Sequence, residues 1–441
     1  MKKRGFTLVE VVVGVFIFLI IALGIYQGFF VATKTVAFAK LKTEAILLAN
    51  EQFELIRNLP YQNLGIVNGL PAGVLPRNQT FARGGVTFNT TLTIRSIDDP
   101  FDGTIGGTPN DTAPADYKEV TLAISCSNCP LTSPLDFVTT VAPKNVESGA
   151  NNGALFIKVV DAAGLPIPSA SVHVQNDQAT PVISVDETTN NNGQLQLVDV
   201  PPGANAYQVV VTKTGYSTEQ TYPPTETNPN PVQPQSTVAV GQVTFNTLTI
   251  DRLSNLPVTA FNQACAPVAA VDFSLTGAKL IGADPDVYKY QQSFTTNGAG
   301  QATINDLEWD NYNLQLTGTA YDLVGITPTL PLSLSPDTTQ NVSLVLTPHA
   351  PRALLVAVED AATGLPVSAA TTTLKQGETM IGEKLTSSAG GCWPAGQAWY
   401  DDLSVGSYEL TVTRDGYQTY TNSAIGVSSD WQKIVVPLPP A

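Results

Sequence analysis

Charged side chains are scarce in this chain of 441 residues. Asp, Glu, Lys and Arg together make up 13% of it, whereas an average soluble domain has about a quarter. Basic residues are the scarcer kind, because 22 lysines and arginines stand against 37 acidic residues and leave a formal net charge of −15. Surfaces that bind nucleic acid need clustered Lys and Arg to displace counterions. The sequence therefore predicts no nucleic-acid partner.

Histidine and cysteine are also rare. The chain has two histidines and four cysteines, and no second Cys-x-x-Cys accompanies Cys126 and Cys129, so the ligand spacing of a structural zinc site is missing. Nucleophile-elbow, zinc-protease, phosphate-loop and dinucleotide motifs are missing as well. We therefore expect no metal, no cofactor and no enzymatic activity. Residues 98–103 are rich in Asp but lack the spacing of an EF-hand, and we interpret them as an ordinary turn rather than a calcium loop.

One long apolar segment dominates the N-terminus. Between Phe6 and Ala32 only four residues are polar, and three basic residues precede the segment at positions 2–4. About 20 apolar residues in a helix cross a bilayer, which is longer than the core of a secretory signal. Basic residues stay on the cytoplasmic side. The pattern predicts a single-pass helix in the cytoplasmic membrane, with the rest of the chain outside.

Two residues distinguish this segment from a plain signal anchor, which is the alternative interpretation. Gly5 separates the basic leader from the apolar run, and Glu10 places a carboxylate inside that run, where it requires a partner. The string KRGFTLVE at residues 3–10 resembles the type IV prepilin signature of pilins and pseudopilins. The resemblance implies cleavage after Gly5 by a prepilin peptidase and N-methylation of Phe6. It also implies that Glu10 meets the N-terminal amine of a neighbouring pilin subunit during assembly.

The helical pattern continues beyond the apolar run and leads into a small sheet. Apolar residues recur at three- and four-residue spacing over residues 34–58, and Pro60 ends the pattern. Residues 86–95 and 117–125 alternate like half-buried strands, and residues 73–80 and 98–114 read as loops. This arrangement resembles the head of a minor pilin. Cys126 and Cys129 follow the second strand, where we expect a small disulfide loop, with free thiols as the alternative.

The remaining two-thirds of the chain repeats itself. Residues 154–168 resemble residues 353–367, and a Gly-Gln pair recurs at Gly193, Gly300 and Gly396. Each pair is followed by a strand that begins with tyrosine: Tyr207, Tyr312 and Tyr408. Three units of 90–100 residues with short alternating strands predict antiparallel β-sandwiches. The units resemble carboxypeptidase-regulatory-like and collagen-adhesin B-type domains, which are small prealbumin-like sandwiches.

The predicted fold class is therefore an α+β pilin-like N-terminal part, formed by a long helix and a small antiparallel sheet, followed by all-β tandem immunoglobulin- or prealbumin-like sandwiches. The predicted boundaries are a leader at 1–5, the membrane-spanning and extended helix at 6–58, a small head at 59–148, and sandwich repeats at 151–252, 253–348 and 351–441.

Three positions in the repeats carry further predictions. Cys265 and Cys392 lie in different repeats, and we expect a disulfide that joins them, with two free thiols as the alternative. Trp393, beside Cys392, is the candidate for an exposed aromatic contact, whereas Trp399 stands where the second repeat has Thr303 and the first has Leu197, and it is expected in a core.

A covalent crosslink is known in some relatives of the adhesin domains, which join a lysine to an asparagine with the help of a carboxylate. Lys158 and Asn246 stand on the first and last expected strands of the first repeat. The acidic helper is missing from the strand that begins at Tyr207, so we do not expect the crosslink.

These features together predict a minor type IV pilin-like filament subunit. It would lie near the filament tip, because a passenger of this size would crowd a shaft, and present its sandwiches for adhesion to a surface receptor or glycan. The alternative is a pseudopilin that primes a type II secretion or DNA-uptake system, with the sandwiches as spacers. In both cases the subunit stays in the membrane until it assembles into an extracytoplasmic filament.

Overall fold

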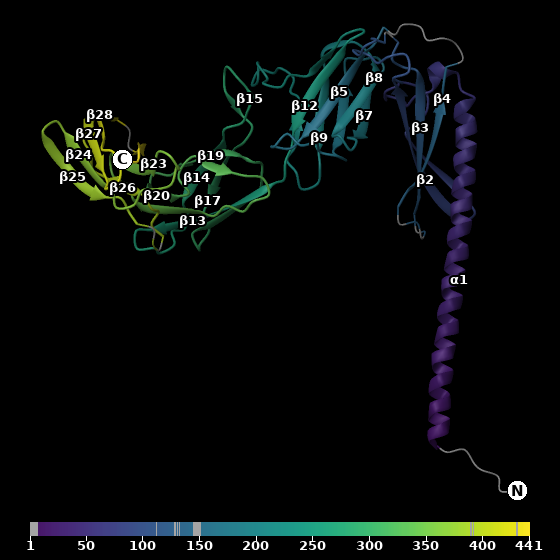
Figure 1. Cartoon of the computed structure of the whole chain (residues 1–441), viewed down its shortest axis with the longest axis horizontal. Coiled ribbons are helices and arrows are strands. Elements are labelled where there is room, and N and C mark those ends of the chain that lie inside the picture. The colour runs from purple at the N-terminus through teal and green to yellow at the C-terminus, as the bar shows by residue number, and fades with distance from the viewer. Residues whose placement is uncertain are drawn as a thin grey trace.

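The computed structural model describes residues 8–111, 113–127, 129, 131, 133–143, 151–388, 390, 392–428 and 431–441. A long helix leads to a small sheet, and three β-sandwiches follow one after another, so that the C-terminus lies far from the N-terminus (Figure 1). This arrangement confirms the predicted fold class.

Helix α1 spans Leu8–Arg57 and has two different halves. At 1.5 Å per residue its 50 residues extend about 75 Å. The described side chains of the first half are exposed as far as Lys40, apart from a partly covered position at residue 22. The second half buries one face, formed by Leu41, Ala45, Leu48, Ala49, Phe53 and Ile56. These residues recur at three- and four-residue spacing and therefore share one side of the helix. A short 3₁₀ helix, Tyr61–Asn63, follows.

The buried face of α1 packs against a four-stranded antiparallel sheet of order β1-β2-β3-β4. We call α1 from Leu41 onward, this sheet and the segments that connect them the head. Its strands are β1 (Asn78–Arg83), β2 (Val86–Ile97), β3 (Tyr117–Cys126) and β4 (Leu135–Val141). Strands β2 and β3 were predicted. Strand β1 corrects the expected loop at residues 73–80, because Asn78–Arg83 pairs with β2 through a turn at Gly84 and Gly85. Strand β4 was not predicted.

Sandwich 1 encloses the core between a sheet of order β10-β9-β6-β7, in which β11 also pairs with β9, and a sheet of order β12-β5-β8. Its strands are β5 (Gly153–Val160), β6 (Ser171–Asn176), β7 (Ile183–Thr188), β8 (Gln194–Val200), β9 (Gly203–Thr212), β10 (Glu219–Gln220), β11 (Ser236–Val238) and β12 (Val243–Thr249).

Sandwich 2 pairs sheets of order β18-β13-β22-β20 and β17-β14-β19-β21, and a hairpin of β15 and β16 projects from it. Its strands are β13 (Ser254–Asn262), β14 (Asp272–Gly277), β15 (Leu280–Gly282), β16 (Val287–Tyr288), β17 (Gln291–Thr295), β18 (Gln301–Leu307), β19 (Asp310–Leu316), β20 (Tyr321–Thr327), β21 (Leu332–Leu334) and β22 (Val342–Pro348).

Sandwich 3 pairs sheets of order β26-β23-β29 and β25-β24-β27-β28. Its strands are β23 (Ala353–Asp360), β24 (Thr371–Gln376), β25 (Thr379–Leu385), β26 (Gln397–Tyr400), β27 (Gly406–Thr413), β28 (Tyr420–Val427) and β29 (Trp431–Leu438). In all three sandwiches the first strand pairs in parallel with the last one, whereas the other pairings are antiparallel.

The sequence repeat corresponds to a repeated local structure. Gly193, Gly300 and Gly396 all have φ near +70°, and a Cβ atom on any of them would lie within 2.8 Å of a backbone carbonyl oxygen of the first strand. Their own carbonyls accept a hydrogen bond from that strand at 2.8 Å. Only glycine combines this backbone conformation with so close an approach. The motif therefore fixes how the first strand of each sandwich meets the turn before its antiparallel neighbour.

The tyrosines of the repeat are fully buried in the three cores. Each hydroxyl donates to a backbone carbonyl shortly before its own strand, from Tyr207 to Pro201, from Tyr312 to Glu308 and from Tyr408 to Ser404, at 2.6–2.7 Å. A buried phenol needs such an acceptor. The tyrosines thus serve the fold.

Candidate functional site

The residues predicted to direct processing lie at or beyond the edge of the described structure. Gly5 and Phe6 are outside the described residues. Glu10 belongs to α1, but its side chain is not described. What the structure shows is the helix that follows them.

The first half of α1 is an uncovered apolar surface. The large apolar side chains from Leu8 to Phe38 are 39–81% exposed. In the described part of the chain α1 is the one helix long and apolar enough to cross a membrane. Such a surface is stable only against lipid or against other apolar helices. It can therefore anchor the chain and, once extracted, pack with similar helices.

The first predicted cysteine pair closes a small loop at the end of β3. Cys126 is the last residue of that strand, and the structure joins it to Cys129, with Cα atoms 5.9 Å apart. Both residues pack against the core of the head. The pair follows a strand and does not open a helix, unlike the redox-active Cys-x-x-Cys arrangement. Its role in the fold is to close the turn.

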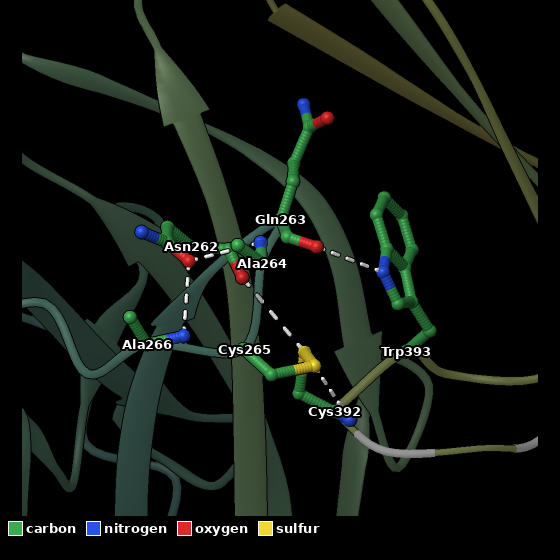
Figure 2. Close-up of a disulfide and its surroundings, with 7 residues drawn as sticks. All are labelled: Asn262, Gln263, Ala264, Cys265, Ala266, Cys392 and Trp393. Carbon is green, nitrogen blue, oxygen red and sulfur yellow. Dashed lines mark hydrogen bonds between the residues drawn. A yellow bond between two sulfur atoms is a disulfide. The ribbon is translucent and has the colours of Figure 1, made fainter.

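The second pair joins two sandwiches. Cys265, between β13 and β14, is bonded to Cys392, between β25 and β26, with Cα atoms 5.4 Å apart (Figure 2). The Asn262 side chain shapes the turn that carries Cys265, since its Oδ1 accepts hydrogen bonds from the N–H groups of Ala264 and Ala266 at 2.9 and 3.0 Å. The disulfide therefore bridges the tight turn of sandwich 2 and a loop of sandwich 3.

Trp393 lies beside this disulfide and corrects the expectation of an exposed aromatic platform. Its indole N–H donates to the carbonyl of Gln263 at 3.1 Å, across the junction between the two sandwiches (Figure 2). The ring is half-buried and packs on a small apolar cluster. The reason is the disulfide itself, which holds the neighbouring residue of the chain against sandwich 2. Trp393 is thus part of the junction.

The junction has an apolar cluster of its own. Trp399 is 8% exposed and packs with Ala353 and Leu355 of sandwich 3 and with Val324 and Val345 of sandwich 2. These residues point away from the two sandwich cores, because their neighbours along each strand fill those cores. Trp399 is buried as expected, but it is buried between two sandwiches rather than inside one.

Polar side chains complete the junction. Gln397 is buried, and its amide accepts from the N–H of Ile326 at 3.0 Å and donates to the carbonyl of the same residue at 2.7 Å. Buried polar groups that find both partners fix one relative orientation. Two further bonds cross the junction, from Trp431 Nε1 to the Leu323 carbonyl at 2.8 Å and from Lys433 Nζ to the Leu330 carbonyl at 2.7 Å.

Sandwiches 1 and 2 meet through a cluster of charges. Lys289 Nζ lies 2.7 Å from carboxylate oxygens of both Glu219 and Glu308, and Lys279 Nζ lies 2.7 Å from Glu308. Burial acts to lower the pKa of both lysines. For Lys289 the two carboxylates prevail and the pKa is raised, whereas for Lys279 burial prevails and the pKa is lowered. The cluster is mutually paired and functions as a joint.

The head and sandwich 1 are joined by apolar and charged contacts. Leu70 of the head belongs to the core cluster of sandwich 1. Arg95 of β2 forms an ion pair with Glu187 of β7, and Arg77 donates to the carbonyl of Asp186 at 3.1 Å. The head is therefore in direct contact with the first sandwich.

Lys118 is a buried charged residue beside this joint. It was not among the site residues predicted from the sequence. Its Nζ donates to the carbonyls of Tyr61 and Leu64 at 3.0 and 2.7 Å and lies 4.5 Å from the centre of the Tyr61 ring. Burial lowers the pKa of the Lys118 ammonium to about 8, and Asp199 of sandwich 1 opposes that effect. A cavity of about 630 Å³ lies next to it, between the head and sandwich 1.

The loop between β2 and β3 gathers three carboxylates. Asp98, Asp111 and Asp116 each have an oxygen within 4.8 Å of the others. Burial raises the pKa of Asp98, and the charges of Asp111 and Asp116 add to the effect, while a hydrogen bond from the N–H of Ile105 opposes it. Asp98 belongs to the Asp-rich segment 98–103, whereas its two partners were not predicted and lie 13 and 18 positions later in the chain.

Comparison with known protein families identifies a motif at the start of the chain. Residues 1–26 match the family model of the prokaryotic N-terminal methylation motif. The chain therefore carries a prepilin-type N-methylation motif, continuous with the exposed apolar half of α1. A search of curated proteins found no match.

Solved structures similar to the chain include the following three. The Bacillus anthracis TIE protein is 14% identical, with 82% of this chain and 72% of that chain covered and a TM-score of 0.19. A streptococcal ancillary pilin is 13% identical, with 66% and 99% covered and a TM-score of 0.19. BcpA, the major pilin subunit of Bacillus cereus, is 10% identical, with 66% and 100% covered and a TM-score of 0.17.

Lys158 and Asn246 do not form the crosslink known from the adhesin domains. Asn246 pairs with Ile157 across β12 and β5, so Lys158 points to the opposite face of the sheet, where it is exposed. The Asn246 amide instead donates to Ser236 Oγ at 3.0 Å. The strand geometry thus agrees with the expectation from the missing acidic helper.

Proposed function

We propose that the protein is a minor type IV pilin-like filament subunit. The observation that carries the proposal is the continuity of the methylation motif with α1, whose first half exposes an apolar surface and whose second half packs under a small antiparallel sheet. Such a helix suits both states that the proposal requires, since lipid covers it before assembly and neighbouring subunits cover it afterwards.

The proposed processing follows from the motif. A prepilin peptidase cleaves after Gly5, Phe6 becomes the N-methylated first residue, and Glu10 pairs with the N-terminal amine of another subunit. An ammonium and a carboxylate neutralise each other in an apolar bundle, where either charge alone would be costly. The N-terminus begins in the cytoplasm, and the head and sandwiches lie outside the cytoplasmic membrane.

The sandwiches support a position at the tip. They form an extended arm beyond the head (Figure 1), and a shaft packed from copies of α1 would have to accommodate one such arm per subunit. Three joints link the head and the three sandwiches in series through apolar and charged contacts. We propose that the arm presents its distal sandwiches for adhesion to a surface receptor or glycan.

The alternative is a pseudopilin that primes a secretion or DNA-uptake system, in which the sandwiches are spacers. Deletion of residues 253–441 separates the two, because it removes sandwiches 2 and 3 but keeps sandwich 1, which covers Leu70 of the head. Filament formation and surface attachment are then assayed separately. Intact filaments with lost attachment support adhesion, and lost filaments support priming. If neither changes, the two distal sandwiches have neither of the proposed roles.

A further inference from the structure

The loop between β2 and β3 fastens the head to sandwich 1 through Ile105. This side chain is 4% exposed and packs with Ala154 and Val198 of sandwich 1. Its backbone N–H donates to Asp98 Oδ2 at 2.9 Å. The anchoring residue is therefore held in place by a carboxylate of its own loop.

In each of the three carboxylates of this loop, one oxygen already accepts a hydrogen bond from a backbone N–H group. Asp98 accepts from Ile105, Asp111 Oδ1 accepts from the N–H of Ala113 at 2.8 Å, and Asp116 Oδ2 accepts from the N–H of Asp99. These bonds fix the orientation of the side chains. They bring one oxygen of each carboxylate to within 4.8 Å of the others.

In two of these carboxylates, the other oxygen has no hydrogen-bond donor among the described residues. Asp98 Oδ1 and Asp111 Oδ2 are inaccessible to solvent and have no hydrogen-bond partner among the described residues. A buried anionic oxygen without a donor or a cation is strongly destabilising. The described residues form no salt bridge to these three carboxylates, and the nearby Lys118 is committed to two carbonyls. One oxygen of each carboxylate lies within 4.8 Å of the others, so a cation bound there would offset this unpartnered negative charge.

The ligand set indicates which cation. Three carboxylates without nitrogen or sulfur ligands favour a hard ion over zinc or copper. Calcium accepts six to eight oxygen ligands in variable geometry and completes its shell with water, whereas magnesium demands a near-ideal octahedron. We propose that Asp98, Asp111 and Asp116 form a calcium site, and that the ion locks the loop that carries Ile105 into sandwich 1. This proposal does not depend on the assembly system.

The test uses the full chain in detergent, first stripped with a chelator and then titrated with CaCl₂ or MgCl₂ by isothermal calorimetry. We expect one calcium ion per chain and weaker magnesium binding. Asp111→Asn keeps the size and the Ala113 hydrogen bond but removes the charge, and it should weaken calcium binding about tenfold or more. Asp136→Asn, at an exposed carboxylate on β4, is the matched control and should bind normally. No calcium uptake at several millimolar, or equal affinity in the Asp111→Asn protein, would overturn the proposal.

Hydrogen exchange tests the locking effect on the unaltered chain. Calcium should slow exchange at the backbone N–H groups of Ile105 and Ala113, which donate to two of the proposed ligands. The N–H of Gly193, inside sandwich 1 and bonded to Asn190, is the internal reference and should not change. Calcium binding that leaves all three rates unaltered would contradict a site in this loop.

Discussion

At the scale of single residues, Lys118 shows how a strand can carry a charge into a core. It lies on the same side of β3 as Val120, Leu122 and Ile124, which are all buried. Its ammonium is satisfied by two carbonyls of the segment that follows α1. Lys118 therefore fastens that segment to the sheet, but it does so with a charge that burial disfavours.

The titration of Lys118 makes stability depend on pH. Its pKa is about 8 in the folded chain, against 10.5 for a lysine in water. Between these values the unfolded chain binds more protons, so stability rises with pH across this window. Across the whole window the free energy of unfolding rises by about 3 kcal/mol, since each unit of pKa corresponds to about 1.4 kcal/mol. Below pH 8 both states are protonated and the contribution is constant.

Comparison with Lys118→Met isolates this effect, because all other titrating groups are shared. The difference in unfolding free energy between the wild type and the variant is measured by denaturant titration from pH 7 to pH 10.5. This difference should be constant below pH 8. Above pH 8 the wild type should become more stable relative to the variant. A difference that stays constant through pH 10 would show that the ammonium is not buried as described.

At the scale of elements, the junction between sandwiches 2 and 3 depends on close approach of β20 to the loop before β26. A Cβ atom on Gly325 would lie 2.6 Å from Cγ of Pro394. Pro394 is buried and lies two residues after the disulfide-bonded Cys392, so it has little room to move. Gly325 is therefore required by contact with the neighbouring sandwich rather than by its own backbone conformation.

Gly325→Ala should accordingly destabilise the junction by about 1–3 kcal/mol, as is usual when an extra methyl group is forced into a packed interface. Gly298→Ala, in the same sandwich but with nothing within 4 Å of the added Cβ, is the control. Thermal unfolding followed by tryptophan fluorescence reports on the junction, because Trp393, Trp399 and Trp431 all lie there. Equal melting temperatures for the two variants would refute the contact.

Local sequence signals predicted several of the elements but not the junctions between them. Apolar periodicity predicted α1 to within a residue at its C-terminal end, and the repeated glycines and tyrosines matched a real structural repeat. The alternation of apolar and polar residues along β3 could have identified Lys118, because it lies on the same face as the buried residues of that strand. Strand β1 was missed because one of its faces is exposed and the other is only partly buried.

The junction residues could not have been found in this way. Trp399 and Gln397 occupy positions whose environment is decided by another sandwich, about 70 residues away along the chain. The three carboxylates of the β2–β3 loop are equally scattered in sequence and meet only after the loop folds back on itself. A single sequence carries no periodic signal for contacts of this kind.

At the scale of the whole molecule, the two disulfides differ in what they can contribute. Closing the 127-residue separation between Cys265 and Cys392 restricts the unfolded chain by about 5 kcal/mol, whereas the three-residue separation of Cys126 and Cys129 is worth about 2 kcal/mol. The larger effect falls on the joint between the two distal sandwiches. It makes them one unit in unfolding.

Chemical unfolding of two double variants tests this difference. Cys265→Ser with Cys392→Ser should lower the midpoint and separate the unfolding of sandwiches 2 and 3. Cys126→Ser with Cys129→Ser, the control for loss of a disulfide, should leave the unfolding of the distal sandwiches unaltered. Identical curves for the wild type and the Cys265/Cys392 variant would contradict the proposed coupling.

The arrangement of the whole chain follows from its N-terminal helix, which must be anchored before it can be assembled. Mass spectrometry of the mature N-terminus tests that claim most directly. The account predicts a chain that lacks its first five residues and begins with N-methylated Phe6. A mature protein that retains Met1, or begins at any residue beyond the apolar half of α1, would contradict it.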